Sequence, residues 1–475
     1  MDDSSDSVDV VVVGAGPAGL VAGIVLGRYG IDVAVVDKRP QGSTLSRALV
    51  ISTRCMEILR SWGLESDVRT GAADVVPRAW VTQSLASREG VEMPLGYPTS
   101  DEAAAVSPTA PAWAPQDHLE PLLRMYLTAM ASARLWFGLQ LEEFHQDDDG
   151  VTLTVRSPDS RRRLITARYV IGADGAHSTI RGAMGVAMDG PDDLAEFHRI
   201  EFQAPLAELV GDRRFGLYVI TNPDAAGVMA ARGCGDRWGF AREWRPTQPR
   251  MVDAGDIELV DLLARAIGAP IPVVLENRSA FSFAAQIAER YRIGRVFLVG
   301  DAAHRMTPRG GTGMNTAIQD AYDLGWRLAW VLRGWATDRL LDAYEAVRRP
   351  VGLHNVDRAG QPDGARRDAE DALPWDLNGR VAHRWITDDQ GAVSTLDLVA
   401  EGFTLFAGAE DPRWATADLN TRAPLRVHSF NEIDASAIDV PIVGARLFGP
   451  DAREIAAWAT YDEFLQAPRA AHWLT

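Results

Sequence analysis

Three glycines and one carboxylate near the start of the chain have the types and spacing that nucleotide binding requires. Gly14, Gly16 and Gly19 form the pattern G-x-G-x-x-G, and Asp37 ends the next apolar run. The first glycine permits a sharp turn, the second leaves room for a pyrophosphate, and the third lets a helix pack close to strands. Free N–H groups at the start of that helix favour phosphate, and Asp37 can accept hydrogen bonds from a ribose. The pattern predicts a dinucleotide site; the alternative is a buried α/β unit whose glycines serve packing alone.

A second glycine-rich stretch lies far along the chain. Gly300 and Asp301 follow the apolar run 295–299, and a proline and three glycines occur within residues 308–313, before a helical pattern begins. The carboxylate can bind a polyol hydroxyl, and the glycines permit close approach of the backbone to a flat ring. The start of the helix can stabilise negative charge on that ring. This stretch indicates a second part of one cofactor site.

A third stretch, residues 172–181, reads Gly-Ala-Asp-Gly-Ala-His-Ser-Thr-Ile-Arg. An apolar run ends in Asp174 and Gly175, and Ser178 can cap a following helix. Taken alone, this stretch favours an ordinary strand-to-helix turn.

The elements that must position these residues follow from apolar periodicity. The runs 8–13 and 33–36 are typical of buried strands, with a helix from Pro17 to about Tyr29 between them. A membrane span over 8–27 is the alternative, but the central Gly-Ala-Gly-Pro argues against it. Further strands are expected over 135–145, 151–156, 164–172 and 295–299, and further helices over 52–62, 119–130, 257–267 and 315–333.

Composition limits the classes of partner. The chain has 475 residues, a net charge of −17 and two cysteines, with a pI near 5.0. Nucleic acids and anionic membrane surfaces select basic patches, so neither is expected as a partner. The first residues, Met-Asp-Asp-Ser-Ser-Asp, form an acidic tail rather than a signal peptide. We therefore expect a cytoplasmic protein without a disulfide framework, a metal site or a membrane segment.

The three stretches together resemble a known family. In order and spacing they are similar to the FAD-binding group A flavoprotein monooxygenases of the para-hydroxybenzoate hydroxylase fold, and within it to aromatic polyketide hydroxylases and related antibiotic-tailoring or antibiotic-modifying enzymes. The resemblance covers residues 8 to about 360. It implies non-covalent FAD, with NADPH or NADH and O₂ as co-substrates. It also implies insertion of one oxygen atom into a polycyclic aromatic or phenolic substrate through a C4a-hydroperoxyflavin.

The resemblance implies cofactor-binding roles residue by residue. Gly14, Gly16 and Gly19 would hold the pyrophosphate. Asp37 would bind the adenosine ribose, and Asp301 would bind the ribityl chain. Thr312 replaces the glutamine that is commoner in the family's flavin loop. No catalytic acid or base is predicted. The expected cofactor contacts are Gly14, Gly16, Ala18, Gly19, Asp37, Lys38, Arg39, Arg47, Gln116, Asp174, Gly300, Asp301, Pro308, Gly311, Gly313, Met314 and Asn315.

The same resemblance sets the expected fold class. We expect an α/β protein with a Rossmann-like FAD domain of the glutathione-reductase type, an inserted antiparallel-sheet substrate domain and a small C-terminal thioredoxin-like domain. Because no C-x-x-C occurs in the sequence, the last domain is expected to be a structural cap. The expected boundaries are 1–75, 101–182 and 284–394 for the FAD domain with its connecting helices, 76–100 and 183–283 for the substrate domain, and 395–475 for the C-terminal domain.

One strand-like run suggests where a substrate binds. In residues 237–244, Trp238, Phe240, Arg242 and Trp244 alternate with smaller or acidic residues and so share one face of a strand. Three aromatic rings and one cation on this face could line one side of a pocket for a flat, acidic polyphenol. The alternative is that this face packs on helices as ordinary core.

Several functions share these motifs. A Baeyer–Villiger or epoxidising enzyme, an antibiotic-inactivating monooxygenase, a flavin reductase or dehydrogenase, and a flavoprotein without oxygenase activity all remain alternatives. A flavin halogenase is disfavoured because no W-x-W-x-I-P stretch is present. The oligomeric state is expected to be a monomer or a homodimer.

Overall fold

A mixed sheet forms the centre of the molecule. The computed structural model describes residues 6–41, 47–388 and 391–466; residues 1–5 of the acidic tail and the segments 42–46, 389–390 and 467–475 lie outside that description. In the sheet, β17, β8, β1, β2 and β5 are parallel neighbours, whereas β16, β7 and β6 pair antiparallel at its margins. Strands buried on both faces account for the continuous apolar runs of the sequence. The strand bounds are β1 Asp6–Val13, β2 Val33–Asp37, β5 Ala133–Phe137, β6 Gln140–Gln146, β7 Val151–Arg156, β8 Arg162–Gly172, β16 Arg292–Ile293 and β17 Val296–Leu298.

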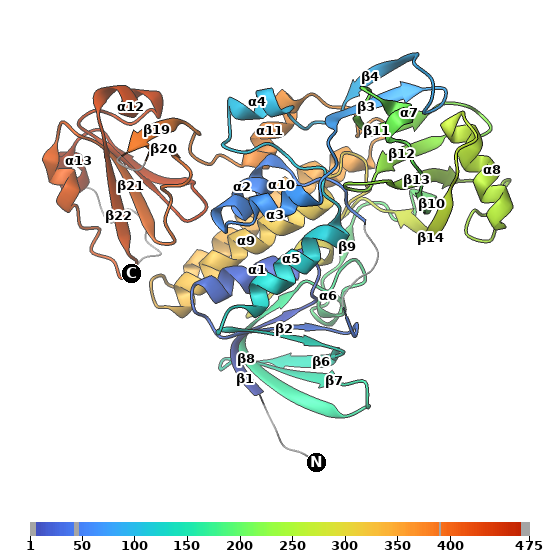
Figure 1. The fold of residues 1–475 in the computed structure, drawn as a ribbon. Coiled ribbons are helices and arrows are strands. Elements are labelled where there is room, and N and C mark those ends of the chain that lie inside the picture. The colour runs from blue at the N-terminus through green and yellow to red at the C-terminus, as the bar shows by residue number, and fades with distance from the viewer. Residues whose placement is uncertain (1–5, 42–46, 389–390, 467–475) are drawn as a thin grey trace.

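Three helices cover one face of this sheet: α1 (Pro17–Arg28), α5 (Gln116–Thr128) and α9 (Gly313–Leu332) (Figure 1). Glycines bring them close to their neighbours. A Cβ on Gly23 of α1 would lie 2.7 Å from Val35 Cγ2, and a Cβ on Gly325 of α9 would lie 2.8 Å from Val25 Cβ. Larger side chains at these two positions would push α1 away from the sheet and from α9.

A second, largely antiparallel sheet lies beside the first domain (Figure 1). Its strand order is β14–β10–β13–β12–β11–β3–β4, and only the β11–β3 pair is parallel. The helix α8 (Asp256–Ile267) packs on one face, where its leucines join the core of the sheet. The bounds are β3 Val76–Thr82, β4 Gly90–Pro94, β10 Ala195–Gln203, β11 Phe215–Ile220, β12 Gly227–Ala231, β13 Arg237–Trp244 and β14 Val274–Phe283.

The C-terminal part has its own sheet, with the order β22–β21–β23–β24. One parallel pair, β21–β22, is followed by two antiparallel pairs, which is the arrangement of a thioredoxin-like sheet. It contacts the first domain through the rings of Phe403 and Trp330, 4.8 Å apart, and through Arg28 Nη2, 2.9 Å from Glu401 Oε1. The bounds are β21 Phe403–Gly408, β22 Leu425–Phe430, β23 Ala445–Phe448 and β24 Glu454–Trp458.

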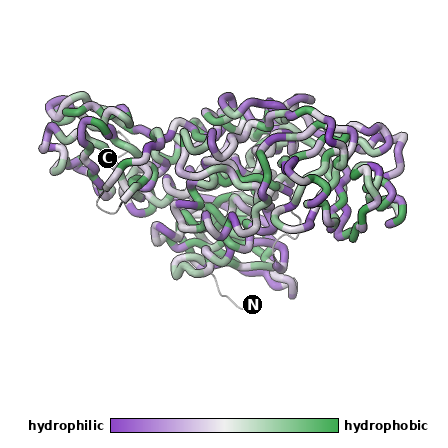
Figure 2. The backbone as a smooth tube through the Cα atoms, turned by 45° about the horizontal axis from the view of Figure 1, so that its top comes forward, coloured by the Kyte–Doolittle hydropathy of each residue, from purple (hydrophilic) through white to green (hydrophobic). Residues whose placement is uncertain are grey.

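Short elements complete the fold. Figure 2 shows hydrophobic segments inside the body and hydrophilic segments along its outer edges. Among the described residues, no helix combines the length and the apolar character that crossing a membrane would require. The remaining bounds are α2 Thr53–Ser61, α3 Glu65–Thr70, α4 Ser100–Ala104, α6 Thr179–Ala183, β9 Met188–Asp189, α7 Ala207–Val210, β15 Gln286–Ala288, η1 Gly300–Ala302, β18 His304–Arg305, α10 Arg339–Gly360, α11 Ala369–Leu377, β19 Trp385–Asp388, β20 Gly391–Ser394, η2 Pro412–Thr416, α12 Glu432–Ala437 and α13 Tyr461–Gln466.

The architecture confirms the expected fold class, with one local correction. The single strand expected over 135–145 is divided into β5 and β6, because the chain turns at Gly138 with a φ of +76°. The short helix α4, whose start is capped by the side chain of Thr99, was not among the expected elements. The domain boundaries stay predictions.

Candidate functional site

The turn after β1 leaves open space at the start of a helix. Gly14 has a φ of +110°, and a Cβ there would lie 2.2 Å from the carbonyl oxygen of Ala173. A Cβ on Gly19 would lie 1.8 Å from the carbonyl oxygen of Gly14. By contrast, among the described residues nothing would lie within 4 Å of a Cβ on Gly16, and none of their side chains caps α1 there. Unpaired N–H groups beside open space fit a pyrophosphate group.

The three glycine-bearing stretches converge at this turn. Ala173, from the stretch after β8, contacts both Gly14 and Gly19. A Cβ on Gly300, at the start of the last stretch, would lie 3.3 Å from the Cβ of Ala18 in α1. Stretches far apart in sequence thus meet near the start of α1, and their residues could contact one elongated cofactor.

Asp37 lies at the end of β2 and is 8% exposed. Its Oδ2 accepts from the backbone N–H of Ala15 at 2.8 Å, and its Oδ1 accepts from that of Arg39 at 2.8 Å. The carboxylate therefore holds the glycine turn in place, and the ribose contact stays a prediction. The side chains of Lys38, Arg39 and Arg47 are exposed.

Asp174 has a structural role in its turn. Its Oδ1 accepts from Ser178 Oγ at 2.5 Å, and its Oδ2 accepts from the N–H of Ile180 at 3.1 Å. Ser178 caps α6 by accepting from the N–H of Arg181, which confirms the predicted cap. Any contact of Asp174 with a cofactor stays a prediction.

A buried ionic network supports the turn at Gly300 and Asp301. Asp320 of α9 is fully buried; its Oδ2 lies 2.6 Å from His304 Nε2 and 3.3 Å from the N of Gly300, and its Oδ1 accepts from Arg348 Nε at 2.8 Å. Burial alone raises the pKa of Asp320, but Arg348 and His304 outweigh burial and hold the pKa below its usual value. Asp320 thus stays charged and fixes the backbone just before Asp301.

Hydrogen bonds from the side chains of Asn315 and Tyr97 hold the loop 308–315 in place. Asn315 Oδ1 accepts from the N–H of Ser52 at 2.8 Å, and Asn315 Nδ2 donates to the carbonyl oxygens of Val50 and Gly311. Tyr97 Oη donates to the carbonyl oxygens of Gly310 and Gly311, at 3.1 and 3.0 Å. The amide of Asn315 is therefore committed to the protein, and only its backbone is left for a cofactor.

The remaining sequence-predicted contacts border the same region. Pro308 is exposed, while Gly311, Gly313 and Met314 are half-buried. Gln116 opens α5, where its Nε2 donates to Glu120 Oε1 at 2.6 Å. Burial raises the pKa of Glu120. The flavin contacts predicted for these residues stay predictions.

Ion pairs join the second sheet to α5. Arg232, which is 2% exposed, has its Nη1 2.9 Å from Glu201 Oε2 and its Nη2 3.5 Å from Asp117 Oδ2. Arg237 Nη2 also lies 2.6 Å from Asp117 Oδ2. These pairs hold the sheet against the start of α5, beside Gln116.

Two of the three residues of β13 that were predicted to contact substrate lie in the core of the second sheet. Trp238 and Phe240 are 5% and 0% exposed, in one core with the leucines of α8. Arg242 lies on the same face; burial, and secondarily Arg265 of α8, lowers its pKa. Trp238 and Phe240 are therefore covered by α8, as in the alternative, whereas a substrate contact of the half-buried Arg242 stays a prediction.

The opposite face of the sheet carries apolar side chains towards the glycine loop. Leu217 and Val219 of β11 are half-buried and belong to one apolar cluster with Val50, Tyr97 and other residues. A Cβ on Gly311 would lie 2.9 Å from Val50 Cγ1. Sequence reasoning missed this cluster, because its members come from separate segments and share no motif.

Comparisons with known proteins agree with this geometry. A model of the FAD binding domain family matches residues 7–359. A putative polyketide hydroxylase from Streptomyces halstedii is 36% identical over 378 residues, 78% of this chain and 67% of its own. The tetracenomycin B2 monooxygenase-dioxygenase of Streptomyces olivaceus is 33% identical, over 89% of this chain and 88% of its own.

A solved structure shares the whole fold. The flavin-dependent monooxygenase PieE, in complex with FAD and substrate, superposes with a TM-score of 0.87 at 25% identity, covering 98% of this chain and 99% of its own. The chain therefore belongs to the FAD binding domain family, among its FAD-dependent aromatic hydroxylases and monooxygenases, and is an oxidoreductase.

Proposed function

We propose that this protein uses NADPH or NADH and O₂ to insert one oxygen atom into a polycyclic phenolic substrate of the polyketide type. The observation that carries the proposal is the apolar cluster between the second sheet and the glycine loop. Val50 and Tyr97 contact Gly311, and Leu217 and Val219 lie in the same cluster. A flat apolar molecule held there would lie against the loop that borders the isoalloxazine.

Relatives support this substrate class. One is named a polyketide hydroxylase and another acts on tetracenomycin B2. Large fused-ring substrates suit an apolar wall, because burying apolar area is the main favourable term in such binding.

The residues of this chain supply binding and shape. Bound FAD accepts hydride from the nicotinamide and activates oxygen. The open turn at Gly16 would hold the pyrophosphate, and the Asp320-supported turn would present Asp301 to the ribityl chain. The apolar cluster would orient the aromatic ring and exclude water. The exposed Arg39 and Arg47 are proposed to attract the phosphates of FAD and of a transiently bound nicotinamide.

Anaerobic stopped-flow reduction of the FAD-bound protein tests the proposal. We expect slow reduction by NADPH or NADH alone, and faster reduction when a polycyclic phenol is present. Labelled O₂ should place one labelled atom in the product, and mass analysis would separate hydroxylation from ring expansion or epoxidation. Equal reduction rates with and without every phenol of the panel, together with peroxide as the only oxygen product, would contradict it.

A further inference from the structure

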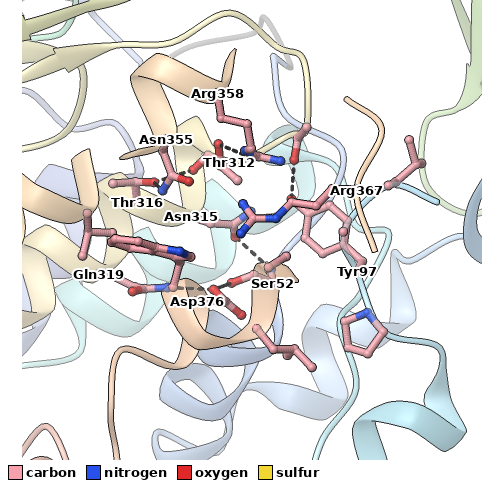
Figure 3. Close-up of a pocket in the computed structure, with 18 residues that line it drawn as sticks. Ser52, Tyr97, Thr312, Asn315, Thr316, Gln319, Asn355, Arg358, Arg367 and Asp376 are labelled. Carbon is pink, nitrogen blue, oxygen red and sulfur yellow. Dashed lines mark hydrogen bonds between the residues drawn. The ribbon is translucent and has the colours of Figure 1, made fainter. Parts of the chain in front are cut away.

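A small cavity lies between the glycine loop, α10 and α11 (Figure 3). Its volume is about 40 Å³, roughly room for three water-sized groups. Its lining includes Thr312 and Asn315 from the loop and α9, Arg358 from α10, and Arg367 just before α11. The cavity therefore borders the glycine loop on the side that faces α10 and α11.

Two guanidinium groups line this cavity without a carboxylate partner. Among residues 6–41, 47–388 and 391–466, no acidic oxygen lies within 4.0 Å of a nitrogen of Arg358 or Arg367. Arg358 Nη2 donates to Thr312 Oγ1 at 3.2 Å and Nη1 donates to the carbonyl oxygen of Gly364 at 3.4 Å. Its buried Nε has no hydrogen-bond partner among the same residues.

Neighbouring groups neutralise this charge only in part: burial lowers the pKa of Arg367, the charge of Asp371 acts in the opposite direction, and Arg367 Nη2 donates to the carbonyl oxygen of Asp371. Burial lowers the pKa of Arg358, and the charge of Arg367 lowers it further. His354, next to them, has its pKa lowered to about 4 by burial, Arg367 and Arg358, so at neutral pH it is uncharged. Its Nε2 can then accept from Arg367 Nη1 at 3.0 Å. Positive charge is therefore concentrated on one side of the cavity.

The one acid that lines the cavity is committed elsewhere. Asp376 accepts from Ser52 Oγ at 2.6 Å, from Gln319 Nε2 at 2.9 Å and from the N–H of Arg54 at 3.0 Å. Burial raises its pKa. Its carboxyl group thus ties α11 to α2 and α9 and, in the described part of the chain, forms no ion pair with either arginine.

We propose that this cavity binds a small monoanion, either a halide or the carboxylate of a small acid, between Arg358 and Arg367. Both arginines are half-buried and lack a carboxylate partner within 4.0 Å among the described residues, and a guanidinium binds a carboxylate or halide through its N–H groups. Because Arg358 also contacts Thr312 and lies against Gly310, the anion would change the charge beside the loop. Only this last consequence rests on the proposed function, since it assumes that the loop borders the flavin.

The test titrates the FAD-bound protein with sodium chloride or sodium formate at constant ionic strength, with sodium gluconate as the balancing salt. Unfolding temperature and the flavin difference spectrum are recorded. We expect saturable changes with chloride, formate or both, and none with gluconate, which is too large for the cavity. Saturation by chloride alone would identify a halide site, and saturation by formate alone a carboxylate site. Identical, unsaturated responses to all three salts would overturn the proposal.

Variants locate the site. Arg358→Gln should weaken anion binding about 10–100-fold, because the substitution removes charge-assisted hydrogen bonds to the anion. The matched control is Arg366→Gln, which removes an exposed charge from outside the cavity lining and should bind anions like the parent protein. If Arg358→Gln does not fold, Arg367→Gln serves instead. Wild-type anion affinity in the folded Arg358 or Arg367 variant would overturn the proposal, whereas FAD content and oxygen insertion test the proposed function separately.

Discussion

Substitutions of the glycines in the first turn should separate cofactor binding from folding. A side chain at Gly16 would enter open space, since a Cβ there meets no atom within 4 Å in the part of the chain that the structure describes. Its φ of −78° is accessible to valine, so Gly16→Val should cost the apoprotein no more than about 1 kcal/mol, the scale of an N-cap change. The valine would, however, occupy the space assigned to the pyrophosphate, and FAD affinity should fall about 100-fold or more, a change of roughly 2.7 kcal/mol.

Gly19→Ala should show the opposite pattern. Its Cβ would lie 1.8 Å from the backbone carbonyl oxygen of Gly14, so the turn itself must move. Overpacking of this kind costs about 1–3 kcal/mol or more, even before any cofactor is present. The matched control is Gly182→Val in α6, where a Cβ also meets nothing within 4 Å and no cofactor is expected.

Two measurements decide the outcome. Urea unfolding of the apoprotein, followed by tryptophan fluorescence, gives the stability change of each variant. Titration with FAD, followed by quenching of flavin fluorescence, gives the affinity. Full FAD retention by Gly16→Val would show that the pyrophosphate does not lie at this turn. A Gly16→Val apoprotein as unstable as Gly19→Ala would show that the turn is not open.

Three further outcomes follow from buried groups. Asp320→Asn should lower the free energy of unfolding by about 3–5 kcal/mol, because it leaves the buried Arg348 without its partner; urea unfolding measures this. The pKa of Asp320 is lower in the folded protein than in the unfolded chain. The ionised carboxylate therefore stabilises the fold fully above the unfolded carboxyl pKa of about 4, and this stabilisation is lost as the pH falls through the lower folded pKa. The stability gap between the parent and Asp320→Asn should therefore close in acid, and a gap unchanged down to pH 2 would contradict this. Phe240→Ala should cost about 3–5 kcal/mol and leave KM unchanged at low temperature, because the ring is core; a raised KM in a stable variant would return Phe240 to the substrate site.

The sequence pattern predicted those parts of the site that are formed by residues close together in the sequence. The glycine turn, the cap by Ser178 and the helix after the flavin loop were all accessible, because each depends on residues close in sequence. The helix, expected from Asn315 to Arg333, runs from Gly313 to Leu332. Helix ends are set by tertiary contacts as much as by propensity, which explains the shift.

The sequence pattern could not predict whether a helix or a ligand covers the apolar face of a strand. The alternation in β13 correctly grouped Trp238 with Phe240, yet apolar faces look alike whether a helix or a ligand covers them. The contacts of Tyr97 and Arg358 with the glycine loop were also inaccessible, because each spans a long stretch of sequence and belongs to no motif. Only the folded chain brings these residues together.

The strand order of the central sheet has a consequence for synthesis of the protein. β1, made first, lies between β2 and β8, but β17 pairs with β8 only after residue 298 has been made, and α9 then packs on α1. At roughly 5–20 residues per second, the ribosome needs about 15–65 s to pass from β1 to the end of α9. During that time the edge of β8 and the apolar face of α1 lack their native cover, which makes aggregation possible. Yield of folded protein should therefore depend on chaperones and on growth temperature more than on the stability of the finished fold.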